Sequence, residues 1–133
     1  MKKILSILCV AVIALTASSC KKETIIAPSN NRTILTDVSS TSWHSEDGGK
    51  TYSAIIDMPE IDDYVNENDG VLVYLSFTDG VWEQVPEVYQ GTSYSYTHNP
   101  GKLVLYAQGY DGAVSITRPD AAQLKIVLVD SEQ

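Results

Sequence analysis

Two hydrophobic patterns divide the chain. Residues 4–17 form an apolar run of 14 residues, ILSILCVAVIALTA. From Arg32 onward, apolar residues instead come in short β-branched and aromatic runs, separated by recurring turn signals. These signals are Asp47-Gly48-Gly49, Asp69-Gly70, Asp79-Gly80, Asn99-Pro100-Gly101 and Asp111-Gly112. Asp-Gly and Pro-Gly pairs favour tight hairpin turns, so the second pattern predicts an all-β protein.

The predicted fold is an antiparallel β-sandwich, immunoglobulin-like, of about seven to eight strands. The strands are expected at residues 33–38, 51–57, 71–77, 81–85, 93–98, 102–108, 113–117 and 124–129. The run Val71–Phe77 is apolar at nearly every position, which indicates a central strand covered on both faces. The turn at Asp79-Gly80 should return the chain antiparallel to it, and Pro86 should end that pairing.

One short crossover helix is expected near residues 58–66. Asp57 and Glu60 have the spacing of a capping box, and Ile61, Tyr64 and Val65 fall on one helical face. Such a helix would carry the chain from one sheet of the sandwich to the other.

The N-terminal pattern predicts a signal peptide over residues 1–19. A membrane-spanning helix needs about 20 apolar residues, which the run at 4–17 does not reach, and Lys2 and Lys3 supply a positive start. Residues 20–31 then read as a flexible tether ending in the breaker cluster Pro28-Ser29-Asn30-Asn31. The sandwich domain is expected over residues 32–133.

Cys20 is predicted to carry a lipid. The sequence Ala17-Ser18-Ser19-Cys20 resembles a bacterial lipobox, in which the thiol is lipidated before cleavage and the new amino terminus is then acylated. Ala17 stands where the usual box has Leu, which fits the looser boxes of the Bacteroidetes. The alternative is ordinary secretory cleavage that leaves a cysteine behind. Cys9 lies within the signal peptide, so the mature chain would contain one thiol and no internal disulfide.

The location expected from this anchor is the cell envelope. Several acyl chains on one cysteine hold a protein durably in a membrane, because each buried CH₂ contributes about 0.8 kcal/mol. Lys21 follows the cysteine, where the enterobacterial rule for retention at the inner membrane requires Asp. An outer-membrane lipoprotein is therefore expected, facing either the periplasm or the cell surface.

The mature chain would be strongly acidic. Removal of residues 1–19 leaves seven Lys and Arg against 17 Asp and Glu, a formal charge of −10. Such a field repels phosphate backbones and anionic lipids, so no nucleic-acid partner is expected, and the acyl group must hold the membrane.

Catalytic patterns are not recognisable in the chain. The two histidines, His44 and His98, have no neighbouring pattern of a nucleophile and an orienting group, and no serine lies in a G-x-S-x-G elbow. With 17 acidic residues, a pair at glycosidase spacing carries no information. The protein is expected not to be an enzyme and to need no cofactor; a small hydrolase is the least favoured alternative.

Two stretches could still bind a ligand. The acidic run from Asp57 to Asp69 raises a calcium hypothesis, although its spacing does not match a D-x-D-x-D-G loop. Tyr94 and Tyr96 project from one face of a predicted strand, and these rings could stack on sugars or face the core. The core alternative is favoured, as it is for Trp43 and Trp82. The possible ligand contacts are Tyr89, Tyr94, Tyr96 and Tyr110.

Core and turn features give the chain a family resemblance. They are Trp43, the crossover at residues 56–65 with Pro59, the run Gly70–Tyr74, the Trp82-x-x-Val-Pro86 segment and the closing run Leu124–Val129. Together they resemble small uncharacterised Bacteroidetes lipoproteins with a β-sandwich domain. The resemblance implies that architecture and an envelope location, and no activity.

These observations lead to one expected function and one main alternative. The first is a non-catalytic, lipid-anchored domain that binds a ligand or assembles with other envelope proteins. The alternative is a carbohydrate-contacting or adhesion module on the outer membrane, which would use the tyrosines of the 89–96 region.

Overall fold

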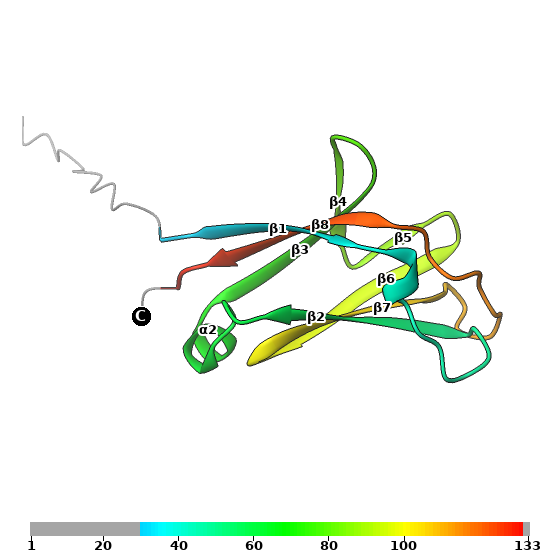
Figure 1. The fold of residues 1–133 in the computed structure, drawn as a ribbon, viewed down its shortest axis with the longest axis horizontal. Helices are drawn as coiled ribbons and strands as arrows, with labels where there is room; N and C mark the ends of the chain where they lie inside the picture. Colours follow the sequence, from blue (N-terminus) through cyan, green and yellow to red (C-terminus); the bar gives the residue numbers. More distant parts are fainter. Residues whose placement is uncertain (1–29, 132–133) are drawn as a thin grey trace, which may run out of the picture.

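Eight strands form two four-stranded antiparallel sheets in the computed structural model, which describes residues 30–131 (Figure 1). The first sheet has the order β1 (Arg32–Val38), β8 (Ala122–Val129), β3 (Gly70–Thr78) and β4 (Val81–Val85). The second has the order β2 (Thr51–Met58), β7 (Gly101–Gly109), β6 (Thr92–Asn99) and β5 (Glu87–Tyr89). The predicted all-β antiparallel sandwich is confirmed.

The core forms where alternate residues of both sheets meet. On β8, the buried residues Leu124, Ile126 and Leu128 alternate with outward residues, and the same period of two holds on β3 and β7. Leu103 and Leu105 of β7 face them from the second sheet, fully buried. This is the alternation of strands with one face in a core and one toward solvent.

The chain crosses between the sheets four times, at β1–β2, β2–β3, β4–β5 and β7–β8. β3 and β4 form the predicted hairpin, in which Gly80 takes a φ of +77° that favours glycine. β3 is also an interior strand, paired with β8 on one side and β4 on the other. Its outward residues Leu72 and Tyr74 are half-buried, so its second face is partly covered.

The crossover helix exists, but its predicted start is wrong. The helix α2 spans Asp63–Asn68 and is capped by Asp62, whose Oδ1 accepts a hydrogen bond from the Val65 amide at 2.8 Å. Asp57 cannot cap a helix because β2 continues to Met58, which pairs with Gly101. Val65 is buried as expected, whereas Tyr64 is exposed.

One further prediction fails, the strand before β8, and the short strand β5 was not predicted. Residues 113–117 form no strand; they lie in a loop between the sheets, where the Ile116 amide donates to the Gly49 carbonyl at 2.8 Å and Asp111 Oδ1 accepts from the Ala113 amide. Pro86 does end the pairing of β4 with β3, but β5 begins directly after it and pairs with β6 in the second sheet. A strand of three residues is too short to show a period in the sequence.

Both ends of the described chain lie at one end of the sandwich, beside α2 (Figure 1). The Asp130 amide donates to Asn31 Oδ1 at 3.0 Å, and Asn30 Nδ2 donates to Asp130 Oδ2 at 2.8 Å. Arg32 donates from its guanidinium to the Glu60 carbonyl at 3.1 Å, which ties β1 to the segment before α2. The loops at residues 39–50 and 110–121 lie at the opposite end.

The predicted signal peptide, Cys20 and most of the tether lie outside the described residues. Within residues 30–131, no helix has the length and apolar character needed to cross a membrane.

Candidate functional site

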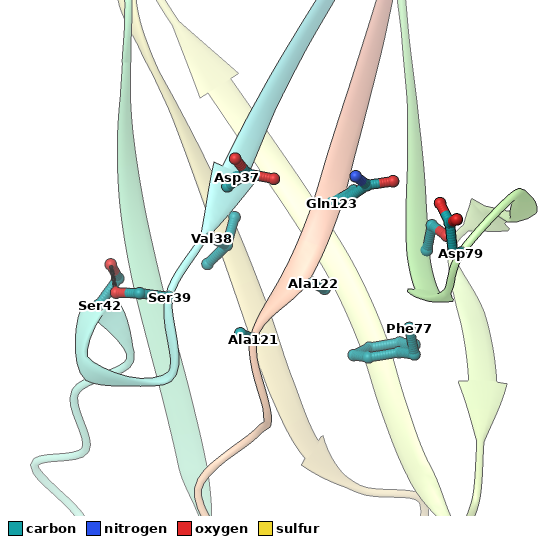
Figure 2. Close-up of a pocket in the computed structure, with 10 residues that line it drawn as sticks. Asp37, Val38, Ser39, Ser42, Phe77, Asp79, Ala121, Ala122 and Gln123 are labelled. Atoms are coloured by element: carbon teal, nitrogen blue, oxygen red, sulfur yellow. Dashed lines mark hydrogen bonds between the residues drawn. The ribbon is translucent and has the colours of Figure 1, made fainter.

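A pocket of about 510 Å³ opens at the end of the sandwich opposite the chain ends (Figure 2). It lies where β1 and β3 finish and β8 begins, and we call it the terminal pocket. Its volume falls in the range of small-molecule sites, roughly 300–1,000 Å³. Ten residues line it: Asp37, Val38, Ser39, Ser42, Ser76, Phe77, Asp79, Ala121, Ala122 and Gln123.

Strand register positions the polar side chains of the terminal pocket. Asp37 pairs with Gln123, which pairs in turn with Ser76, so the three residues form one row across β1, β8 and β3. Asp79 comes from the β3–β4 turn. Figure 2 shows Asp37 and Asp79 on opposite sides of the pocket with Gln123 between them. Both aspartates and Gln123 are exposed to solvent.

The terminal pocket has an apolar floor. Val38 and Ala122 are buried members of the core, and Phe77 packs against that core from the end of β3. The Phe77 ring is stacked on Tyr89 at 4.9 Å between centroids and tilted against Tyr94 at 5.2 Å. These contacts pack the Phe77 ring against two strands of the second sheet, β5 and β6.

The hydroxyl groups of the terminal pocket are engaged locally. Ser76 Oγ donates to the Thr78 carbonyl at 2.7 Å, and Ser39 Oγ lies 2.9 Å from both Thr41 Oγ1 and Ser42 Oγ. Among its lining residues there is neither an imidazole nor a thiol to act as a base or nucleophile toward them. The arrangement is suited to binding, with two carboxylates and one amide over an apolar surface.

A second feature, the aromatic patch of Tyr74, Trp82 and Lys125, lies on the same outer face of the first sheet. Lys125 is two residues along β8 from Gln123 and pairs with Tyr74. Its Nζ lies 4.6 Å from the Tyr74 ring centroid and 4.4 Å from that of Trp82. Both distances are within the range of cation–π attraction. The expectation that Trp82 is a core residue is wrong, since it is half-buried on the outer face.

The four candidate tyrosines lie in different environments. Tyr94 and Tyr96 do share one face of β6, and it is the inner face: Tyr94 is 5% exposed, and Tyr96 donates from its hydroxyl to the Val71 carbonyl at 2.6 Å. Tyr89 is half-buried against Phe77. Tyr110 is 74% exposed, in the loop after β7. The structure therefore brings the first three toward the core, while Tyr110 projects into solvent.

Tyr89 and Tyr94 also line a small cavity of about 150 Å³, together with Phe77, Arg118 and Asp120. Burial raises the pKa of Tyr94 to about 12, with further contributions from Glu87 and Asp120. Burial also raises the pKa of the nearby Glu87 carboxyl, assisted by the charge of Glu83. One carboxylate oxygen of Glu87 is buried without a hydrogen-bond partner in the described part of the chain.

The acidic run and the histidines form no comparable site. Within residues 30–131, no three His, Cys, Asp or Glu side chains gather as a metal site would require, so the calcium hypothesis receives no support. Asp62 caps α2, and Asp69 Oδ1 accepts from the Ser131 amide at 3.3 Å. His98 Nδ1 is hydrogen-bonded to Asn66 Oδ1 at 2.9 Å, and His44 is exposed beside β2.

Sequence reasoning missed the residues that shape the terminal pocket. Asp37 and Gln123 are 86 positions apart in the chain and meet only through strand pairing. Asp79 was recognised solely as a turn former. For Tyr74, a signal existed: it alternates with the buried Val73 and Leu75, which places it on the outer face.

Comparisons of the chain with protein-family models, with curated proteins and with solved structures found no match. The interpretation of these surfaces therefore rests on their geometry and on the N-terminal sequence.

Proposed function

We propose that this protein is a non-catalytic, lipid-anchored bacterial envelope protein that binds a ligand or partner at the terminal pocket. The anchor would be an acylated Cys20 in the outer membrane. The tether at residues 20–31 would then reach at most about 40 Å from the bilayer.

The observation that best supports this proposal is that the chain ends and the terminal pocket lie at opposite ends of the domain. β1 runs from Arg32, near the end of the tether, to Asp37 and Val38 in the wall of the terminal pocket. Seven residues of strand span roughly 20 Å. An anchor at Cys20 would therefore attach the membrane at the end of the domain opposite the terminal pocket, which would leave the pocket open to a partner.

The chemistry of the described surface also supports binding over catalysis. The terminal pocket combines an apolar floor with a few polar groups that can orient a ligand, which is the usual composition of a binding site. Its hydroxyl groups already hydrogen-bond to neighbouring backbone or hydroxyl groups.

Replacement of the two cysteines in turn tests the anchor. Cys20→Ser in the producing bacterium should abolish incorporation of an alkyne fatty acid and move the protein from the membrane to the soluble fraction. The matched control is Cys9→Ser, which removes the other thiol of the chain and should leave labelling and membrane retention unchanged. A Cys20→Ser protein that is still labelled and membrane-bound would disprove the anchor.

A second function, contact with carbohydrate, is supported by the aromatic patch. Tyr74 and Trp82 are half-buried on an outer sheet face, where aromatic rings can stack against sugar rings. This carbohydrate site differs from the site expected from the sequence, which used Tyr94 and Tyr96, because those two rings lie in the core. Binding of a neutral oligosaccharide that is lost in Trp82→Ala and retained in Tyr110→Ala would favour it.

A further inference from the structure

We propose that the terminal pocket binds a primary alkylammonium group, such as a lysine side chain of a partner or a free polyamine. This inference rests on the proposed binding function and specifies the chemistry of its ligand. Three properties of the pocket lead to it: the charge of its rim, the absence of a Lys or Arg from its described lining, and its apolar floor.

The rim presents more hydrogen-bond acceptors than donors, because the Gln123 amide is the donor that lies between two carboxylates. Carboxylates only accept hydrogen bonds, and Asp37 and Asp79 stand on opposite sides of the pocket. Neither carboxylate has a hydrogen bond or an ion pair with any other residue in the range 30–131. An ammonium group carries three donors and no acceptor, so it complements this rim better than a neutral ligand does.

No Lys or Arg is among the described residues that line the pocket, and the lysine that β8 carries on the same face is engaged elsewhere. Lys125 lies two residues along β8 from Gln123, and its Nζ lies over the rings of Tyr74 and Trp82. That contact leaves the two aspartates to act on an incoming charge. The excess of acidic residues across the chain adds a field that concentrates cations near the pocket.

The floor suits the stem that carries the ammonium group. Val38, Phe77 and Ala122 give the pocket an apolar surface below its carboxylates. An alkylammonium chain is built the same way, with methylene groups that gain by burial and a charged head that stays hydrated or paired. A metal ion would leave this floor unused and would find fewer oxygen ligands than calcium requires.

The test uses the full lipidated protein in an uncharged detergent, with NMR observation of the Gln123 side-chain amide and the Phe77 ring. The probes are Nα-acetyl-lysine methylamide and spermidine, which separate a protein side chain from a free polyamine. The neutral comparison is Nα-acetyl-norleucine methylamide, which keeps the stem and lacks the charge. We expect saturable shifts with at least one ammonium probe, none with the neutral probe, and weakening as salt is added.

Variants of the rim supply the decisive comparison. Asp37→Asn and Asp79→Asn should each weaken binding roughly three- to tenfold, and the double variant should abolish it. Asp57→Asn removes one charge from the exposed end of β2, away from the terminal pocket, and should leave the affinity unchanged.

Three results would overturn the inference: binding of norleucine and lysine amides alike, equal weakening in all three single variants, or shifts with calcium or a neutral oligosaccharide while both ammonium probes are silent. None of them would affect the anchor, which is read out separately by fractionation of Cys20→Ser. Conversely, loss of the anchor would leave the binding measurement valid.

Discussion

The two tryptophans of the chain occupy opposite environments. Trp43 lies fully buried between the sheets, with its ring edge against Tyr94 at 6.3 Å between centroids. Trp82 lies on the outer face of the first sheet, beside the Lys125 ammonium. One ring therefore belongs to the interior that holds the sheets together, and the other to a surface that the fold does not require.

This difference separates positions that specify the fold from positions free to serve binding. The inward residues of the interior strands β7 and β8 are mostly apolar and alternate with outward residues, so burial alone explains most of them. The outward rows differ between the sheets. The first sheet presents Tyr74, Trp82 and Lys125, whereas β6 of the second presents Ser93, Ser95 and Thr97. This contrast between the aromatic patch and β6 is consistent with the proposed binding function on the first sheet.

The largest difference in stability is expected between the alanine variants of the two tryptophans. Trp43→Ala would leave a cavity in the core and should lower the free energy of unfolding by about 3–5 kcal/mol. Trp82→Ala removes one cation–π contact at a half-exposed position and should cost less than about 1 kcal/mol. Urea denaturation of both variants measures the two losses. Equal losses would contradict the division between interior and surface.

A smaller effect is expected from removing a tyrosine hydroxyl on each side of the second sheet. Tyr96→Phe deletes the hydrogen bond from the inner face of β6 to the Val71 carbonyl and should cost about 1 kcal/mol. Tyr106→Phe deletes a contact of 3.4 Å with Thr97 Oγ1 on the outer face and should change stability by only a few tenths of a kcal/mol. A larger loss for Tyr106→Phe would reverse the comparison.

The smallest expected effect concerns the partly buried carboxyl of Glu87. Folding raises its pKa, so the folded state holds this proton more tightly, and the group's contribution to stability falls as pH rises through that pKa. Glu87→Gln should therefore raise Tm by ~1–2 °C at about pH 7 and by less at about pH 4. Thermal melts at both pH values measure this difference. Glu46→Gln, which removes the same charge at an exposed loop position, is the matched control.

The sequence predicted the parts of the fold that depend on local patterns. Seven of the eight strands, the β3–β4 hairpin and a helix between β2 and β3 follow from alternation and turn residues. The loop at residues 113–117 has strand-like composition, but its hydrogen bonds go to Asp111 and Gly49. No neighbouring strand pairs with that segment in the described part of the chain, and the sequence alone does not show which strands will be neighbours.

The terminal pocket could not be predicted, because its residues come from three strands and three connecting segments that meet only in the folded chain. Pairing of Asp37 with Gln123 requires knowing that β1 lies beside β8. The alternation of Tyr94 and Tyr96 with serines was visible in the sequence, and it correctly favoured the core for both rings. Which face of β6 met the core became certain only from the packing of the second sheet.

The placement of the terminal pocket and the chain ends has a mechanical consequence. If Cys20 is anchored and a partner pulls on the terminal pocket, the load enters through Arg32 and runs along β1. Seven residue pairs, from Arg32–Leu128 to Val38–Ala122, join β1 to β8. A force parallel to these strands loads all their hydrogen bonds together in shear, whereas a transverse force would peel them one at a time. If both attachments exist, the β1–β8 pairing would transmit the tension between them.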